Sequence, residues 1–223
     1  MKHYQFGLDS IEFSNIKAIL FDFDGPLCDV FARISADSIA RELQTMIGRQ
    51  HDSDDPLDVL ESLGQGDRST LVKVEDELTS WEVRAVNNSL TTPGGLECVC
   101  ACAEFGLLTG IVSNNSASSV STFVEKQGLA SFVQTIVGRA YAAPEKMKPN
   151  PWPLQLALKN LEISAGEAVM VGDSLSDIQA ALATGVPVIG YANKPGKREL
   201  FQPFNVPIIE TMWELHRVIR ILD

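Results

Sequence analysis

The chain has 223 residues, of which 45% are hydrophobic and 21% charged, proportions that are ordinary for a folded globular protein. Its formal net charge of −11 argues against a broad nucleic-acid surface, because binding to a phosphate backbone requires clustered Lys and Arg. No apolar run approaches the roughly 18 residues that span a membrane, and residues 1–15 lack the pattern of a signal peptide. We therefore expect no nucleic-acid partner, no membrane segment and a cytoplasmic location, for a protein that is a monomer or a homodimer.

The first predicted strand, Ala18–Phe21, ends at two aspartates that are one residue apart. The run is short and rich in branched and aromatic side chains, which favours a buried strand over a helix. Asp22 and Asp24 follow, and Gly25 then allows the backbone to turn without steric penalty. In open α/β sheets, ligands bind beyond the carboxyl ends of the strands. This pair of carboxylates is therefore the first candidate for a reaction centre.

More than 80 residues separate Asp24 from the next predicted strand, which begins at Leu107. One crossover between parallel strands needs only about a dozen residues or somewhat more, so the excess must form an inserted unit. Apolar residues recur near helical spacing in three parts of it: Ala32–Ile47, Pro56–Leu63 and Val72–Val86. We predict a small α-helical cap domain at residues 30–91 and a catalytic core at residues 1–29 and 92–223.

A further helical pattern, Leu96–Phe105, contains three of the four cysteines. On a helix, Cys98 and Cys102 share a face and Cys100 points elsewhere; the fourth cysteine is Cys28. Zinc sites favour wider spacings, such as two cysteines with two residues between them. We interpret the cysteines as small apolar core residues and not as metal ligands.

Short apolar runs alternate with helical patterns along the rest of the chain. The predicted strands are Leu107–Val112, Phe132–Val137, Ala168–Val171, Val186–Ile189 and Pro207–Ile209. The predicted helices are Ser118–Lys126, Pro153–Asn160, Ser176–Ala183 and a C-terminal helix with capping-box spacing at Thr211 and Glu214. This alternation is typical of an α/β fold with a doubly wound, mainly parallel, Rossmann-like sheet.

Polar side chains lie near the points where several of these strands end. They are Asp22 and Asp24 after the first strand, Ser113 and Asn114 after the second, Lys148 between the third and fourth, Asp173 after the fourth, and Asp177 one helical turn later. The carboxyl ends of parallel strands meet at one edge of the sheet, so we expect these groups to converge there. Each group alone is typical of a solvated turn, a helix cap or a surface residue. Their joint placement favours a reaction centre.

Four segments carry a resemblance to a known family. They are Phe21–Gly25, Val112–Asn114, Lys148–Pro149 and Gly172–Asp177, in this order along the chain. On these segments the chain resembles the haloacid dehalogenase-like superfamily of phosphohydrolases. The resemblance is to its phosphatase type with a helical cap after the first motif, similar to the phosphoglycolate phosphatases. It covers the core from about Lys17 to Tyr191.

The resemblance implies a role for each carboxylate. Asp22 is implied as the nucleophile that forms an aspartyl-phosphate, and Asp24 as the group that protonates the leaving oxygen and then activates water. Asp22 and Asp173 are implied as side-chain ligands of Mg²⁺, with Asp24 contributing its backbone carbonyl and Asp177 holding the outer shell. The residue types agree, because crowded carboxylates repel one another and oxygen ligands suit hard Mg²⁺.

The resemblance also implies a phosphate-binding set. Lys148 and Ser113 would offset the negative charge of the transferring phosphoryl group, which makes Lys148 both catalytic and phosphate-binding. Backbone N–H groups near Asp24, Gly25 and Asn114 would complete the cradle.

The predicted function is the Mg²⁺-dependent hydrolysis of a small phosphorylated metabolite, a phosphomonoester similar to phosphoglycolate or a sugar phosphate. Asp24 favours this class over the dehalogenating and phosphonate-cleaving relatives, which lack an aspartate at that place. Two alternatives stay open: a phosphomutase of the β-phosphoglucomutase type, and a non-catalytic binding module on the same fold. Pro26 departs from the family, which usually has Thr or Val there, and removes one backbone donor from the loop.

Substrate selection is expected to come from the cap. Its cations Arg33, His51, Arg68 and Lys73 could contact an anionic substrate, although each is more typical of a solvated surface. The basic segment Asn193–Arg198 after the fifth strand could likewise reach the site, but it is more typical of an exposed loop.

Overall fold

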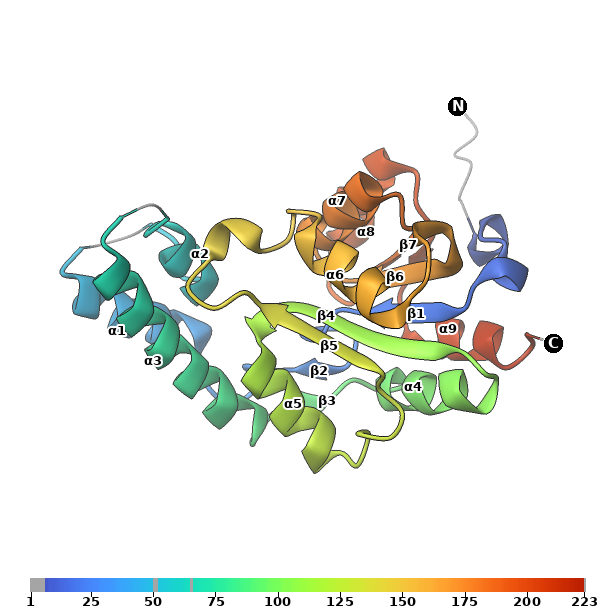
Figure 1. Ribbon diagram of the computed structural model, residues 1–223, viewed down its shortest axis with the longest axis horizontal. Coiled ribbons are helices and arrows are strands. Elements are labelled where there is room, and N and C mark those ends of the chain that lie inside the picture. Colours follow the sequence, from blue (N-terminus) through green and yellow to red (C-terminus); the bar gives the residue numbers. More distant parts are fainter. Residues whose placement is uncertain (1–6, 50–51, 65, 223) are drawn as a thin grey trace.

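A six-stranded parallel sheet forms the centre of the computed structural model, which describes residues 7–49, 52–64 and 66–222. Its strands are β1 (Ala18–Phe21), β4 (Leu108–Ser116), β5 (Thr135–Arg139), β6 (Ala168–Gly172), β7 (Val188–Tyr191) and β8 (Ile208–Ile209). They lie in the order β5-β4-β1-β6-β7-β8, and every neighbouring pair is parallel (Figure 1). The strand order reverses at β1, which is where such sheets bind ligands. The predicted fold class is confirmed.

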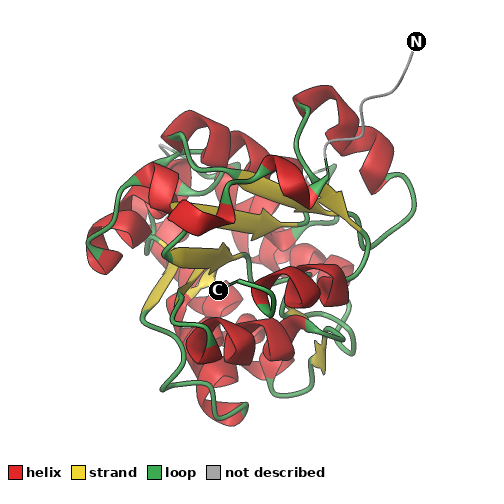
Figure 2. Ribbon diagram, turned by 90° about the vertical axis from the view of Figure 1, so that its right-hand side faces the viewer, coloured by secondary structure: helices red, strands yellow, loops and turns green. Residues whose placement is uncertain are grey.

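Helices cover both faces of the sheet (Figures 1 and 2). One face carries α4 (Gly95–Glu104), α5 (Ala117–Lys126) and α9 (Met212–Ile219), and the other carries α6 (Trp152–Leu161), α7 (Leu175–Thr184) and α8 (Lys197–Phe201). Because both faces are covered, the central strand β1 is wholly apolar, and all four of its residues are buried. Short 3₁₀ turns complete the core: η1 (Leu8–Ser10), η2 (Phe13–Asn15), η3 (Pro144–Lys146), η4 (Ala165–Glu167) and η5 (Gln202–Phe204). Within the described residues, no helix combines the length and hydropathy that a membrane crossing requires.

β4 and β5 differ most from the bounds that the apolar runs predict. β4 continues beyond Val112 through the polar segment Ser113–Ser116, and its register against β5 shifts within that segment. An irregularity of this kind changes the direction in which side chains point, and it lies where the site is predicted. β5 begins at Thr135 because Phe132 still belongs to the preceding turn.

Three helices form the inserted unit beyond the carboxyl end of the sheet: α1 (Ala36–Ile47), α2 (Pro56–Glu61) and α3 (Arg68–Val86) (Figure 1). The side chain of Ser35 caps α1, and that of Asp67 caps α3 by accepting from two N–H groups of its first turn. These two caps explain why α1 begins later, and α3 earlier, than the apolar spacing predicts.

The buried side chains of the three helices form a cluster of their own, which includes Ile39, Leu43, Leu60 and Leu78. The chain enters and leaves the unit through β2 (Cys28–Asp29) and β3 (Leu90–Thr91), which pair with each other in antiparallel fashion. A cap domain requires a hydrophobic core of its own and two linker segments that lie side by side, and this unit has both. The domain bounds at residues 30 and 91 remain a prediction.

The cysteines lie in the core as free thiols. Cys28, Cys98 and Cys102 are buried and Cys100 is half-buried. Burial raises the pKa of Cys102 to about 12, so this thiol is protonated at neutral pH. The interpretation of the cysteines as small core residues is confirmed for the three buried ones.

Candidate active site

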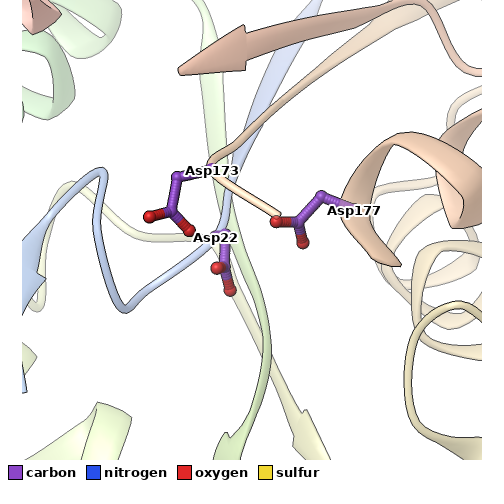
Figure 3. Close-up of side chains that lie close together, drawn as sticks. All are labelled: Asp22, Asp173 and Asp177. Carbon is purple, nitrogen blue, oxygen red and sulfur yellow. The ribbon is translucent and has the colours of Figure 1, made fainter. Parts of the chain in front are cut away.

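The predicted site residues meet at the carboxyl ends of β1, β4 and β6, facing the cap. Six of them line one cavity of about 660 Å³: Asp22, Asp24, Ser113, Asn114, Lys148 and Asp173. Asp177 lies beside them in the first turn of α7 (Figure 3). A larger cavity, of about 1000 Å³, is bounded by η1 and α9 and is lined by none of these residues.

Lys148 is buried and bridges two carboxylates. Its Nζ lies 2.8 Å from Asp22 Oδ1 and 2.5 Å from Asp177 Oδ1, and it also donates to the carbonyl oxygen of Val112 at 2.8 Å. Burial alone would lower the pKa of Lys148, but Asp177 and Asp22 outweigh this effect and raise the pKa above its ordinary value. Lys148 is therefore charged and places a fixed positive charge beside Asp22.

Asp22 is buried at the end of β1, where its N–H donates to the carbonyl oxygen of Val171 at 2.8 Å. Burial and the neighbouring Asp177 raise the pKa of Asp22 to about 8, against the opposing effect of Lys148. The single ammonium of Lys148 thus contacts two carboxylates, and its one positive charge does not balance two negative charges. A further cation at this position would lower the pKa of Asp22 and restore its ionised form.

Both carboxylate oxygens of Asp177 already have partners. Oδ1 accepts from Lys148, and Oδ2 accepts from the N–H of Ser174 at 3.0 Å and from its hydroxyl at 2.6 Å. Ser174 in return accepts from the N–H of Asp177 at 3.2 Å, which completes a capping box at the start of α7. A Cβ on Gly172 would lie 2.3 Å from Asp177 Cβ, so the close approach requires glycine. Asp177 is held firmly, which agrees with an outer-shell role.

Carboxylate oxygens of Asp22, Asp173 and Asp177 lie within 4.8 Å of one another (Figure 3). Both carboxylate oxygens of Asp177 accept hydrogen bonds. Asp22 Oδ2 and Asp173 Oδ1, in contrast, accept no hydrogen bond from any described residue. Hard oxygen donors of this kind, beside a cavity open to a phosphate group, suit Mg²⁺. The donor set therefore fits a magnesium ion held by Asp22 and Asp173.

The loop after β7 contacts Asp173. Asn193 Nδ2 donates to Asp173 Oδ2 at 2.9 Å, and Lys197 Nζ forms an ion pair with the same oxygen. The prediction that Asn193–Arg198 is an exposed loop is therefore wrong for these two residues. Because β7 lies next to β6 in the sheet, the loop that follows β7 reaches the end of β6. Lys194 of this loop is exposed and also lines the cavity.

Asp24 has a different environment from Asp22. Its Oδ1 accepts from the N–H of Val30, at the start of the predicted cap, at 2.8 Å. Burial raises the pKa of Asp24 to about 6. A carboxyl group with this pKa exchanges its proton readily near neutral pH, which is what a general acid–base requires.

The turn after Asp24 accommodates Pro26 without loss of a hydrogen bond. The N–H groups that close the turn belong to Gly25, Leu27 and Cys28. Gly25 adopts a φ of +107°, and a Cβ there would lie 2.4 Å from Asp173 Cγ, so the turn requires glycine. The N–H of Gly25 donates to the carbonyl oxygen of Cys28 at 2.7 Å. Its predicted contact with phosphate would replace this bond and remains a prediction.

Ser113 and Asn114 lie on the irregular end of β4. Ser113 is buried, and its Oγ donates to Asn115 Oδ1 at 3.1 Å and accepts from the N–H of Asn115 at 3.0 Å. The Asn114 side chain binds the backbone of Lys148: Oδ1 accepts from the Lys148 N–H at 2.8 Å, and Nδ2 donates to its carbonyl at 3.0 Å. Asn114 thus positions Lys148. A direct phosphate contact from Ser113 or Asn114 remains a prediction.

The cap side of the cavity is acidic. Eight carboxylates and two lysines line the cavity among the described residues: Asp22, Asp24, Asp29, Asp54, Asp55, Asp58, Glu61 and Asp173, with Lys148 and Lys194. We call Asp54, Asp55, Asp58 and Glu61, which lie in or just before α2, the acidic cap wall. Burial, followed by repulsion from neighbouring carboxylates, raises the pKa of both Asp55 and Glu61. The wall therefore places four acidic groups close together on one side of the cavity.

Three of the four predicted cap cations, those within the described residues, do not contribute to this lining. Arg33 and Lys73 are exposed, Arg68 donates to the carbonyl oxygen of Ala142 at 2.7 Å, and none of these three lines the cavity. His51 lies outside the described residues. The acidic cap wall was not predicted. The sequence feature that indicates it is a run of acidic residues that immediately precedes and enters the helix beginning at Pro56.

The model of the haloacid dehalogenase-like hydrolase family matches residues 19–191 of this chain. The match covers most of the chain and the four motif segments, so the chain belongs to this family. A solved structure from Clostridium acetobutylicum, described as a predicted phosphatase, superimposes with a TM-score of 0.74 at 19% identity. It covers 92% of this chain and 98% of that one, and at this identity the likeness shows the fold.

Two curated relatives indicate the type within the family, and both are phosphoglycolate phosphatases. The protein from Rhodospirillum rubrum is 36% identical over 107 residues, which are 46% of this chain and 44% of that protein. The protein from Neisseria gonorrhoeae is 30% identical over 198 residues, which are 79% of this chain and 80% of that protein. The chain is thus an enzyme of the phosphatase type, similar to the phosphoglycolate phosphatases.

Proposed function

We propose that the protein is a Mg²⁺-dependent phosphomonoesterase that hydrolyses a small phosphorylated metabolite through an aspartyl-phosphate on Asp22. The observation that carries the proposal is the contact between buried Asp22 and the ammonium of Lys148 at 2.8 Å, with Asp24 lining the same cavity. Asp22 lies beside a fixed positive charge, whereas Asp24 has a pKa of about 6. Two carboxylates in such different environments are suited to the separate roles of nucleophile and acid–base.

In the first step, a carboxylate oxygen of Asp22 attacks phosphorus, and the bond between phosphorus and the substrate oxygen breaks. Asp24 gives its proton to the departing oxygen, so the alcohol leaves as a neutral molecule. In the second step, Asp24 takes a proton from a water molecule whose oxygen attacks phosphorus, and the bond to Asp22 breaks. Inorganic phosphate leaves, and both aspartates return to their starting protonation states. Lys148 offsets negative charge at the phosphoryl group throughout.

Asp22 and Asp173 would hold Mg²⁺ together with the backbone carbonyl of Asp24. When bound, the ion offsets the negative charge of the phosphoryl oxygens. The chain holds these ligands in place: Lys148 fixes Asp22, and Asn193 and Lys197 fix Asp173.

The acidic cap wall bears on the choice of substrate. With the phosphoryl group at the strand ends, the rest of the substrate faces the wall, where a carboxylate would meet like charges and a hydroxyl or ammonium would not. Two curated relatives are phosphoglycolate phosphatases. We nevertheless propose that this chain prefers phosphomonoesters with a neutral or positively charged leaving group over phosphoglycolate.

A phosphate-release assay tests the proposed function. The panel contains phosphoglycolate, several sugar phosphates and an aminoalkyl phosphate, each with Mg²⁺ and with a chelator. We expect release that depends on Mg²⁺, with kcat/KM lower for phosphoglycolate than for the neutral and cationic esters. A phosphomutase would instead isomerise a sugar phosphate primed with a bisphosphate and release little phosphate. No turnover of either kind would overturn the proposal in favour of a binding module.

A further inference from the structure

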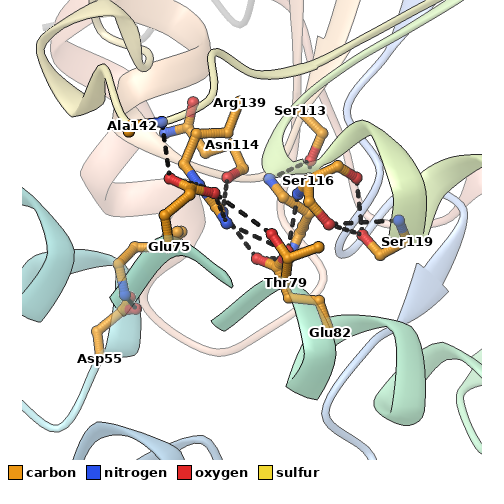
Figure 4. Close-up of polar contacts among 12 residues, drawn as sticks. Asp55, Glu75, Thr79, Glu82, Ser113, Asn114, Ser116, Ser119, Arg139 and Ala142 are labelled. Carbon is orange, nitrogen blue, oxygen red and sulfur yellow. Dashed lines mark hydrogen bonds and ion pairs between the residues drawn. The ribbon is translucent and has the colours of Figure 1, made fainter. Parts of the chain in front are cut away.

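Arg139, the last residue of β5, joins the cap to the core through a buried ion-pair cluster (Figure 4). Its Nη2 lies 2.7 Å from Glu75 Oε1 and its Nη1 lies 2.8 Å from Glu82 Oε1, and both glutamates belong to α3. The three side chains are 0% to 2% exposed. Residues seven apart on a helix share a face, so α3 presents both carboxylates to the same guanidinium.

The same cluster binds segment 113–116, the polar end of β4 that begins with the predicted phosphate-binding residues Ser113 and Asn114. Arg139 Nη1 donates to the carbonyl oxygen of Asn114 at 2.7 Å. Glu82 Oε2 accepts from the N–H of Ser116 at 2.8 Å, and Glu82 Oε1 accepts from Asn115 Nδ2 at 3.3 Å. Arg139 and Glu82 thus hold three consecutive residues of this segment, on the side away from β1.

A continuous set of contacts runs from this cluster to the proposed nucleophile. Asn114, whose carbonyl Arg139 holds, binds the backbone N–H and carbonyl of Lys148 with its side chain. The Nζ of Lys148 in turn contacts Asp22. A displacement of residues 114–116 would therefore move the lysine that supports the reacting carboxylate.

Stability alone is a weak reason for such a cluster. Taking three charges out of water is costly, and apolar side chains of similar volume often stabilise a protein equally well or better. Directed hydrogen bonds to a backbone segment are what an apolar cluster cannot supply. The cluster's contacts with the carbonyl of Asn114 and the N–H of Ser116 are of this kind.

We propose that Arg139 and Glu82 are positioning residues for the phosphate-binding segment 113–116, which they hold in register with the cap helix α3. The catalytic consequence rests on the proposed phosphatase function. Glu75 has a different part: apart from Arg139, its described hydrogen-bond partners are the N–H of Ala142 and the hydroxyl of Thr79, both at 3.4 Å and both outside the segment. It anchors Arg139 without touching residues 113–116.

Two isosteric variants separate positioning from simple structural support. Every described hydrogen-bond partner of Glu82 is a donor, so Glu82→Gln must turn its NH₂ group against a donor in either orientation. In Glu75→Gln the NH₂ group also meets donors, but Oε1 can stay on Arg139 with bonds of 2.7 and 2.9 Å, and only the longer contacts of 3.2 and 3.4 Å are lost. Glu77→Gln, which removes a half-exposed carboxylate on the same helix, is the charge control.

The experiment measures three quantities on wild type and the three variants: kcat and KM with p-nitrophenyl phosphate and Mg²⁺, thermal midpoint, and amide hydrogen exchange of residues 113–116. For Glu82→Gln we expect kcat to fall about 10- to 100-fold, the size of effect that a displacement of about 1 Å produces. Exchange in the segment should become faster at the same time. Glu75→Gln should lower the thermal midpoint but keep kcat within about twofold of wild type.

Two results would overturn the inference. One is unchanged segment exchange in Glu82→Gln. The other is an equal fall of kcat in Glu75→Gln and Glu82→Gln, which would make the cluster a structural support only. Hydrogen exchange can be measured on a protein that does not turn over substrate. If the wild type has no phosphatase activity, the proposed function is refuted. The exchange rates of residues 113–116 then still decide whether Glu82 positions the segment.

Discussion

Lys148 shares one ammonium between two buried carboxylates, and its single positive charge does not balance both. Asp22, which shares Lys148 with Asp177, keeps a pKa of about 8. Asp24 has no contact with Lys148 and accepts one backbone hydrogen bond, with a pKa of about 6. The first carboxylate therefore depends on a cation for its charge, and the second exchanges protons near neutral pH.

Asp24→Asn should separate the two chemical steps. With an alkyl phosphate, which needs its leaving oxygen protonated, we expect kcat to fall by about 10²- to 10⁴-fold. With p-nitrophenyl phosphate, whose leaving group needs no acid, the first step should proceed and the second should not. Stopped-flow absorbance should then show a burst of p-nitrophenol equal to the enzyme concentration. Equal losses with both esters and no burst would contradict the role of Asp24.

Asp22→Asn should change how stability depends on pH in the metal-free protein. The pKa of Asp22 rises from 3.8 to about 8 on folding, so between these values the folded state binds more protons than the unfolded state. Stability from this group is present at low pH and is lost as pH rises through about 8. Relative to wild type, the variant should therefore gain stability as pH rises across this range, measured by urea unfolding. A difference that is independent of pH would contradict the raised pKa.

At the scale of elements, α3 and β4 together connect the cap to the site. α3 carries two glutamates to Arg139 in the core, and β4 extends into the polar segment that binds one of them, Glu82. Glycines permit the close approaches: a Cβ on Gly138 would lie 2.2 Å from the backbone nitrogen of Ala117. The geometry of segment 113–116 thus depends on α3, β4 and β5 and not on one strand alone.

Arg139→Met should destabilise the protein strongly, because it leaves Glu75 and Glu82 buried without a positive partner. We expect the free energy of unfolding to fall by about 3–5 kcal/mol. Arg41→Met, which removes an exposed ion pair with Asp37, is the matched control and should change it by no more than about 0.5 kcal/mol. Urea unfolding followed by circular dichroism measures both. Similar losses in the two variants would show that Arg139 is not needed to balance the buried charges.

The strand-end rule that located Asp22, Ser113 and Asp173 applies equally to Arg139, which ends β5. Its partners were harder to predict, because Glu75 and Glu82 lie more than 50 residues away and only the docking of α3 brings them near. The sequence feature that could have indicated these partners is the position of both glutamates on the apolar face of a predicted helix. The contact of Lys197 with Asp173 similarly follows from strand order, which the alternation of strands and helices does not specify.

At the scale of the whole molecule, a parallel sheet presents the catalytic groups and a helical unit covers them. The core motifs were predictable because each lies next to an apolar run with a clear end. The helical cap was also predicted, but the cap residues that line the cavity were not, because only the arrangement of its three helices brings them there. Its acidic wall, in and just before α2, is the part of the molecule to which we assign the choice of substrate.

The double variant Asp55→Asn, Glu61→Gln should relax this discrimination. Asparagine can still cap α2, where Asp55 accepts from the N–H of Leu57 at 2.8 Å, so the helix should be retained. We expect kcat/KM for phosphoglycolate to rise by about 5- to 50-fold, equivalent to about 1–2 kcal/mol of removed repulsion, with little change for a neutral ester. Steady-state kinetics with both esters measures this. An unchanged ratio of the two kcat/KM values would show that the wall does not face the leaving group.

The central claim is that Asp22 receives the phosphoryl group. The direct measurement is an acid quench during steady turnover with Mg²⁺, followed by proteolysis and mass spectrometry of the peptide that contains Asp22. We predict a phosphate on Asp22 in the wild type, an increased fraction of it in Asp24→Asn, and none in Asp22→Asn, which should also release no phosphate. Wild-type-like phosphate release by Asp22→Asn, with no phosphorylated peptide in either protein, would contradict the account.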